Sequence, residues 1–271
     1  IKLRFPAFLE TSLRDVSRLA TPLALIVLGG LGFFVWSDVW DKHSFCRLRL
    51  HTKIVLTATA GLLLFGFGLT LLFEWSNPAT LGAFDTPHKL LAAAFESVTL
   101  RTAGFNTIDL GALTGPSQAV SCLLMFIGGS PGSTAGGIKT VTAAVLVLTA
   151  ISAFCGRTTV SAFGRTIAPR SIMNAVTLLM AGGVLCLVGA CAIAGIEDAP
   201  FHQCLFEAVS AFGTVGVSMG LTPTLSAASC VILIVMMYMG RVGVLTLGVA
   251  VFMRRREPPR LKYPDADVFI G

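Results

Sequence analysis

The feature that most constrains this chain is a series of apolar stretches, several of them about 20 residues long. A helix of that length crosses the roughly 30 Å hydrocarbon core of a bilayer. Hydrophobic residues make up 54% of the chain and charged residues only 13%, whereas soluble domains carry about a quarter charged residues. We therefore predict an all-α membrane protein embedded in the lipid bilayer. The apolar spans fall at about 20–36, 54–73, 118–128, 138–154, 171–195 and 226–253.

Two shorter, half-polar stretches lie between these spans, at about 88–100 and 201–212. Neither is long enough to cross a bilayer, and each follows a full span and precedes a segment that contains glycine. Such stretches are typical of short helices that enter the membrane and return on the same side.

Basic residues between the spans predict the orientation. The linkers 38–53 and 155–170 and the tail are basic, so the positive-inside rule places all three in the cytoplasm. The alternate connections carry acidic residues and little basic charge, and they would face outside. The first 18 residues oppose this scheme, because they carry four basic residues on the side predicted to be outside. The basic residues are too evenly spread, with no interleaved aromatic residues, to predict nucleic-acid binding.

The chain contains an internal repeat. Residues 95–99 (Phe-Glu-Ser-Val-Thr) resemble residues 206–210 (Phe-Glu-Ala-Val-Ser), about 111 positions later. Each copy is followed by a Thr-x-Gly triplet, at 102–104 and 214–216, and each lies between two apolar spans. The order span, short helix, glycine loop, span therefore occurs twice. The negative ends of both short helix dipoles would lie near mid-membrane, where they favour a cation.

The two Thr-x-Gly loops have the composition of a potassium filter. Such filters replace the hydration shell of the ion with backbone carbonyl oxygens, and glycine permits the unusual backbone angles that this requires. A threonine hydroxyl can add a further oxygen. We predict that potassium binds at the filter carbonyls only, with no other metal or cofactor in this chain. The predicted ion-binding residues are Thr102, Ala103, Gly104, Phe105, Thr214, Val215, Gly216 and Val217.

At these residues the chain resembles the Trk/Ktr/HKT superfamily of potassium transporters, and most closely its KtrB/TrkH membrane subunits. Residues 97–107 resemble the third filter, 129–140 the broken helix after it, and 239–243 the last inner helix. The segments 29–33 and 50–56 resemble the connection between the second and third repeats. The resemblance extends from about residue 22 to the C-terminus.

This resemblance implies four repeats of M1, pore helix, filter loop and M2 around one pore. It also implies a multi-pass protein of the plasma (inner) membrane, a homodimer, and a cytoplasmic nucleotide-binding regulatory subunit of the KtrA/TrkA type. We expect this chain to lack the first repeat and most of the second, and so not to conduct alone. The implied parts are the end of repeat two with a cytoplasmic linker (1–53), repeat three with a broken second helix (54–154), a cytoplasmic linker (155–170), repeat four (171–253) and a cytoplasmic tail (254–271).

The segment 128–137 holds five glycines and a proline between apolar stretches. Irregular backbone of this kind cannot face lipid, because its polar groups would be unsatisfied. The resemblance makes it an intramembrane gate loop below the filter, and a plain kink is the alternative. Arg241 lies inside an apolar span, where a charge is costly unless it faces a water-filled cavity. The resemblance implies that it projects into the pore below the filter, and snorkelling to an interface or a structural ion pair is the alternative. The predicted gate residues are Gly128, Gly129, Ser130, Gly132, Ser133, Thr134, Gly136, Gly137 and Arg241.

Two other functions compete with a potassium pore. Residues 128–132 fit the G-x-S-x-G pattern of a serine hydrolase with Ser130 as the nucleophile, followed by Asp198 and His202. That motif requires a strand before the serine, and an apolar helical span precedes it here, so we predict that the chain is not an enzyme. A non-conducting structural membrane fragment is the other alternative. The choice between potassium and sodium depends on all four filters, although the resemblance favours potassium because Gly104 and Gly216 are glycines.

Several other polar residues have weaker functional signals. Lys139 is as well explained by snorkelling to an interface as by a role in gating. Glu96 and Glu207 occupy equivalent places on the short helices, and we expect helix capping or packing at least as much as attraction of cations. The seven cysteines and four histidines form no ligand spacing, and we predict packing or interfacial roles for them.

Overall fold

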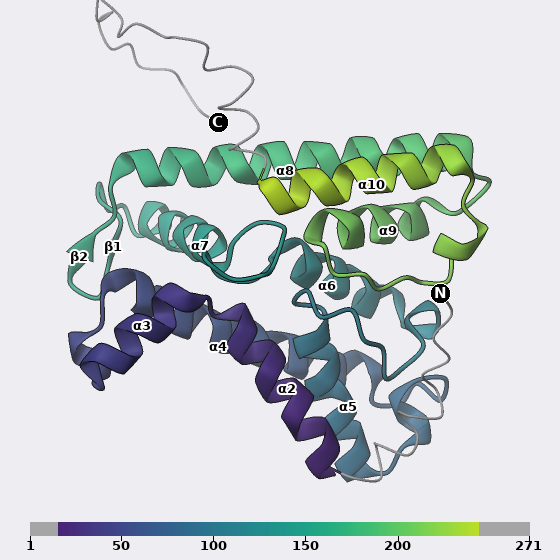
Figure 1. The fold of residues 1–271 in the computed structure, drawn as a ribbon, viewed down its shortest axis with the longest axis horizontal. Coiled ribbons are helices and arrows are strands. Elements are labelled where there is room, and N and C mark those ends of the chain that lie inside the picture. Colours follow the sequence, from purple (N-terminus) through teal and green to yellow (C-terminus); the bar gives the residue numbers. More distant parts are fainter. Residues whose placement is uncertain (1–15, 244–271) are drawn as a thin grey trace, which may run out of the picture.

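The computed structural model describes residues 16–243, with side chains from residue 21 onward. Helices dominate it (Figure 1). The predicted tail and the end of the last span lie outside the described residues, as do Lys2, Arg4 and Arg14. The helices are α2 (Val16–Gly30), α3 (Phe33–Lys42), α4 (Leu50–Glu74), α5 (Thr86–Thr99), α6 (Gly115–Phe126), α7 (Thr140–Phe154), α8 (Pro169–Ile196), α9 (Phe201–Gly213) and α10 (Ala227–Val242). Short 3₁₀ turns are η1 (Phe45–Arg47), η2 (Leu81–Ala83), η3 (Leu110–Ala112) and η4 (Thr222–Thr224).

The helices pack in two groups. Helices α8, α9 and α10 lie together, and α4 packs on α5 in the other group (Figure 1). Helix α6 contacts both α4 and α9, so it joins the groups. One buried apolar cluster extends through this junction, and it includes Leu124 and Met125 of α6 and Phe206 and Phe212 of α9. Both short helices contribute to this cluster, α9 through these two rings and α5 through Ala92 and Ala93.

Two of the described helices, α4 and α8, are long and apolar enough to cross a membrane by length and composition. The pair α2 and α3 would make a third span, but the two helices meet at an angle of 94°. The sequence predicted one continuous span here, and the structure breaks it at Leu31 and Gly32. Gly32 has φ 81°, and a Cβ there would lie 2.5 Å from the carbonyl oxygen of Pro131. Only glycine fits this bend.

Proline marks several helix starts. Helices α5, α6 and α8 each have a proline in the first two positions. The fixed φ of proline suits a helix there, and the N–H that proline lacks would have no partner within the helix. Helix α10 begins differently, because the Ser226 hydroxyl accepts a hydrogen bond from Ser229 N at 3.5 Å.

An acidic residue at the end of each long helix accepts hydrogen bonds from residues at the start of a later helix. Glu74 ends α4 and is fully buried, and its carboxylate accepts hydrogen bonds from Thr114 N at 2.9 Å and Thr114 Oγ1 at 2.7 Å. Thr80 Oγ1 at 2.6 Å and Asn77 Nδ2 at 2.7 Å also donate to it. Both carboxylate oxygens of Glu74 are therefore engaged, one by the residue that precedes α6.

Glu197 does the same for the second group of helices. It follows α8, and one carboxylate oxygen accepts from Ser226 N at 2.8 Å and Ser229 Oγ at 2.7 Å at the start of α10. The hydrogen bonds from Ser226 and Ser229 hold the pKa of this carboxyl below its usual value.

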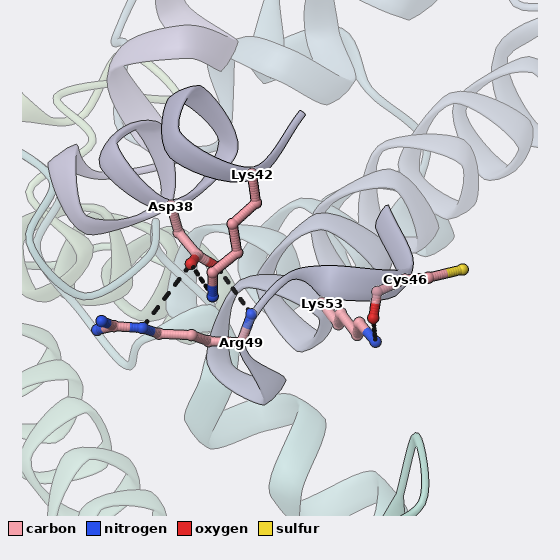
Figure 2. A network of polar contacts seen from close by, with 5 residues as sticks. All are labelled: Asp38, Lys42, Cys46, Arg49 and Lys53. Atoms are coloured by element: carbon pink, nitrogen blue, oxygen red, sulfur yellow. Dashed lines mark hydrogen bonds and ion pairs between the residues drawn. The ribbon is translucent and has the colours of Figure 1, made fainter. Parts of the chain in front are cut away.

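The two basic linkers between helices contact each other. Asp38 accepts hydrogen bonds from Lys42 Nζ at 2.7 Å and Arg49 N at 2.8 Å, which fixes the first linker between α3 and α4 (Figure 2). The second linker carries a hairpin, β1 (Ser161–Ala162) and β2 (Arg165–Thr166), that an all-α prediction omits. Its turn has φ 50° at Phe163 and 75° at Gly164, as a type I′ turn requires. The Phe163 ring meets Phe45 edge-on, with centroids 6.2 Å apart.

We predict that Glu74→Ala destabilises the intact protein by about 2 kcal/mol, because it leaves buried and partly buried donors of Thr80, Asn77 and Thr114 without their acceptor. The melting temperature in detergent measures this effect. Glu197→Ala is the matched control and should lower the melting temperature less, since Glu197 lies at a more exposed helix end. Equal melting temperatures for the two variants would contradict the importance that we assign to the buried carboxylate.

Candidate functional site

The loop after α5 has an unusual backbone. We call residues 102–105 the third loop. Thr102 has φ 72° and Gly104 has φ 79°, with Ala103 at ordinary φ between them. A β-branched residue at positive φ is rare, because its side chain crowds the backbone. The strain is held in place by the end of α5, where the Thr99 carbonyl accepts from Ala103 N at 3.0 Å.

The loop after α9 repeats this pattern. We call residues 214–217 the fourth loop. Thr214 has φ 54° and Gly216 has φ 90°, again with a residue of ordinary φ between them. The amide of Val215 donates to the Ser210 carbonyl at 2.9 Å. Two segments about 111 residues apart thus have the same alternation of left-handed and ordinary residues. Such alternation turns successive peptide groups so that their carbonyl oxygens can point to one side.

A hydroxyl from each short helix braces its loop. Thr99 Oγ1 donates to Phe105 O at 2.6 Å and accepts from Phe105 N at 2.9 Å. Ser210 Oγ donates to Val217 O at 2.6 Å. Thr99 and Ser210 are the hydroxyl residues that end the repeated motif, and both are buried. The sequence showed that they recur, but it did not assign them this function.

The two loops lie against each other. A Cβ added to Gly104 would lie 2.4 Å from the carbonyl oxygen of Val215, so a larger residue cannot occupy this position without displacing the fourth loop. Nothing lies within 4 Å of the equivalent point at Gly216. A cavity of about 250 Å³ borders the fourth loop there, and Thr214, Gly216 and Leu233 contribute to its wall.

The broken segment, predicted at 128–137, extends over residues 127–139 between α6 and α7, and hydrogen bonds join its two ends. Ile127 and Ile138 form a parallel bridge, with Gly128 N donating to Ile138 O at 2.8 Å. Thr140 N donates to Gly129 O at 3.0 Å. We call the paired ends, residues 127–129 and 137–140, the neck, and we call residues 130–136 the tip.

The tip contacts two separate parts of the chain. Ser130 N donates to Gly30 O at 3.0 Å, and Gly132 O accepts from Phe33 N at 3.3 Å, both at the bend between α2 and α3. Gly136 N donates to Thr214 Oγ1 at 3.0 Å, which connects the tip directly to the fourth loop.

Of the remaining predicted residues, Gly137 donates its N–H to Gly240 O of α10 at 3.2 Å, and Ser133 Oγ donates to Ser130 O at 2.6 Å. Thr134 is exposed. Arg241 lies in the last turn of α10 with an exposed side chain, next to Gly240, which Gly137 contacts. Lys139 donates to Ala135 O and lies near enough to Arg241 for the two cations to interact.

The two glutamates of the repeated motif differ in their surroundings, and neither caps a helix N-terminus. Glu207 accepts hydrogen bonds from Ser218 Oγ and from Thr222 Oγ1, the latter at 2.6 Å. The Glu96 carboxylate is buried and has no hydrogen-bond partner among the described residues. Within residues 21–243 no cluster of three or more His, Cys, Asp or Glu side chains could hold a metal ion.

One buried residue at this site was missed from the sequence. Arg101 immediately precedes the third loop and is only 8% exposed. Its guanidinium donates to Gly128 O and Thr140 Oγ1 at the neck. A lone arginine in an apolar stretch beside a Thr-x-Gly triplet was the signal, since ionisable residues inside a membrane mark functional positions.

Comparison with known proteins identifies the family. The family model described as TrkH, a cation transport protein, matches residues 16–257. The chain belongs to this TrkH family. It is 39% identical over 253 residues to the potassium/sodium uptake protein NtpJ of Enterococcus hirae, covering 92% of this chain and 56% of NtpJ. It is 40% identical over 247 residues to the Ktr system potassium uptake protein B of Bacillus subtilis, covering 91% of this chain and 55% of that protein.

The fold of this TrkH-family chain also matches a solved structure. The crystal structure of the potassium transporter TrkH from Vibrio parahaemolyticus aligns with a TM-score of 0.68 and 17% identity, covering 88% of this chain and 53% of that one. The chain spans about half the length of the relatives it matches. The relatives are named for ion uptake rather than for hydrolysis. Ser130 moreover follows helix α6 and not a strand, which is not the setting that a serine-hydrolase nucleophile requires.

We predict that Gly136→Ala displaces the tip, because the added Cβ would lie 2.4 Å from Thr214 Oγ1. The melting temperature of the intact protein in detergent should fall by several degrees. Gly183→Ala on α8 is the control, since nothing lies within 4 Å of its Cβ and alanine favours a helix. A Gly136→Ala protein as stable as the control would show that the tip does not need this close contact.

Proposed function

We propose that the intact protein takes up potassium across the plasma membrane through a pore that the third and fourth loops help to line. In this proposal the backbone carbonyls of residues 102–105 and 214–217 replace part of the hydration shell of the ion. The broken segment is the gate below them. Two further repeats, absent from this chain, complete the ring, so this chain alone does not conduct.

The observation that carries the proposal is the shared backbone of the two loops. Each has a threonine and a glycine at positive φ, two residues apart, and each is braced by a buried hydroxyl of the preceding short helix. Strained backbone that the surrounding structure holds in place is concentrated at functional sites. Carbonyl oxygens arranged in this way suit a dehydrated monovalent cation, and the relatives named for potassium uptake agree with that ion.

The contacts of the broken segment support a gate rather than a plain kink. A kink needs only a local break, whereas this segment is seated against the fourth loop, α10 and the bend between α2 and α3. Arg241 belongs to the same region in this proposal, as a cation near the path that the ion takes. Displacing the tip would remove backbone from below the fourth loop.

The orientation and partners follow from the same proposal. The two basic linkers meet through Phe45 and Phe163, as expected if both lie in the cytoplasm. Gly111 and Met219, from the segments that follow the two loops, also approach each other, as expected if both segments face the same side of the membrane. Relatives named as Ktr system proteins favour a multi-component system. We therefore propose a multi-pass homodimer with a nucleotide-binding regulatory subunit of the KtrA/TrkA type.

We predict that Gly216→Ser in the intact protein weakens selection of potassium over sodium, because a side chain at φ 90° forces the backbone of the fourth loop to change. Gly104→Ser should reduce uptake more severely, since its side chain also collides with Val215 O. Uptake of both ions is measured in cells that lack their own potassium uptake systems, with Gly183→Ala as the control. Unchanged selectivity in a membrane-inserted Gly216→Ser protein would remove this residue from the filter.

We also predict that deleting residues 130–135 raises the potassium flux of the intact protein, because the deletion removes the tip from below the fourth loop. Flux into proteoliposomes measures this, and the potassium-to-sodium ratio should stay near that of the unmodified protein. An unaltered flux in a folded deletion protein would favour the plain kink. Absence of flux in the unmodified protein would contradict the proposed function itself.

A further inference from the structure

The most unusual charged group in the described chain is the guanidinium of Arg101. It lies two residues beyond the end of α5 and is only 8% exposed. A charged side chain at such depth in a membrane protein is unfavourable unless specific partners compensate for lost hydration. Its Nη2 donates to Thr140 Oγ1 at 3.0 Å and to Gly128 O at 3.3 Å, while its Nε has no partner among the described residues.

The two acceptors stand on opposite sides of the neck. Gly128 follows the end of α6 and Thr140 begins α7, and the Thr140 hydroxyl donates to Gly128 O at 3.1 Å. Gly128 O therefore receives two donors, and the Thr140 hydroxyl both donates and accepts. Arg101 thus completes a small hydrogen-bond network that holds the two ends of the broken segment together. Its charge strengthens each of the bonds that it donates.

The second repeat supplies an internal comparison. Aligning the repeated motifs places Phe212 opposite Arg101. In that repeat the later helix, α10, is continuous from Ala227 to Val242 as far as the chain is described. Phe212 packs on Phe126 with ring centroids 5.6 Å apart and lies close to Gly240. The cation thus occurs in the repeat whose later helix is broken, where carbonyls such as Gly128 O have lost their helical partners.

We propose that Arg101 is a positioning residue that fastens the neck of the broken segment to the base of the third loop. This inference rests on the proposed function only in that the tip is taken as the moving part of a gate. The neck is the fixed hinge, because moving it would strand a buried guanidinium in a medium of low polarity. The tip, residues 130–136, is joined to Thr214 and to the bend between α2 and α3 by neutral backbone and hydroxyl bonds, and it separates from these two partners. The bond from Lys139 to Ala135 O lies within the broken segment and does not tie the tip to either of them.

The test measures exposure of the tip without measuring ion transport. Ser130 is fully buried and its hydroxyl has no partner in the described chain, so Ser130→Cys removes no hydrogen bond seen there. In the intact Ser130→Cys protein in membrane vesicles, a membrane-impermeant thiol reagent labels the introduced thiol when the tip opens. Labelling of the protein with Ser130 unchanged gives the background from the natural cysteines.

Three changes at the neck are compared in the Ser130→Cys protein. Arg101→Gln should raise the labelling rate by about tenfold or more, as expected for loss of charge-assisted hydrogen bonds. Arg101→Lys, which keeps the charge, should stay closer to the parent. Thr140→Val should also raise the rate, with little further increase when combined with Arg101→Gln, because both remove one network. Thr149→Val on α7 is the matched control, since its hydroxyl bonds only within the helix, to Val145 O at 2.7 Å.

Three results would overturn the inference. One is unchanged labelling in folded Arg101→Gln and Thr140→Val proteins. Another is a fully additive effect of the two changes, which would place the action of Arg101 elsewhere. The third is a change in potassium-to-sodium selection without a change in labelling, because Arg101 would then support only the third loop. If Arg101→Gln does not fold, the Thr140→Val result alone decides. Failure of the intact protein to move potassium would contradict the proposed function and leave the labelling result standing.

Discussion

The need to satisfy every backbone polar group inside a membrane governs this structure. A broken helix exposes N–H and C=O groups that lipid cannot hydrogen-bond, so each must find a partner in the protein. Here the partners come from distant parts of the chain, among them Gly30 O, Gly240 O and the Thr214 hydroxyl. The broken segment is therefore packed against the surrounding elements rather than free. The same requirement explains the bend at Gly32, which brings backbone donors and acceptors of α2 and α3 to the tip.

The strain in the two loops is maintained by the same pairing of polar groups. A left-handed threonine is unfavourable in isolation, and it persists only where its surroundings fix the backbone. Thr99 and Ser210 supply that fixation through hydroxyl bonds to the residue after each glycine. Thr214 has a further partner in Gly136 N, so the first residue of the fourth loop is also a contact of the tip. The tip and this loop are thus directly connected by one hydrogen bond.

The sequence predicted much of the helix order because apolar length and glycine position follow directly from bilayer thickness and backbone freedom. The short helices α5 and α9 and the irregular segment between α6 and α7 lie near their predicted places. Family membership, predicted from the filter and broken-helix motifs, is confirmed by the family model that matches residues 16–257. The 94° bend between α2 and α3 could not be predicted from the sequence, since a glycine such as Gly32 among apolar residues is also compatible with a straight helix.

Side-chain partnerships across the fold were the least predictable part. Glu74 and Thr114 are 40 residues apart, and Arg101 and Thr140 are 39 apart, so neither pair has a local sequence signal. The repeated motif showed that Thr99 and Ser210 occupy equivalent positions. It did not predict which groups their hydroxyls bond, because that depends on the loop geometry. The small hairpin at Phe163 was hidden for a related reason, because a two-residue strand has no periodicity to detect.

The two loop glycines are equivalent in sequence but not in surroundings. Both need positive φ, yet only Gly104 lies against a carbonyl oxygen of the other loop, whereas the same side of Gly216 is open. In the proposed ring of similar loops each glycine would face a carbonyl of the next loop, as Gly104 faces Val215 O, and the open side of Gly216 would face a further loop. The asymmetry between Gly104 and Gly216 thus accords with a chain that spans about half the length of its relatives. In the proposed pore, the approach of Gly104 to Val215 O implies that the ring closes from the third loop through the fourth to the first.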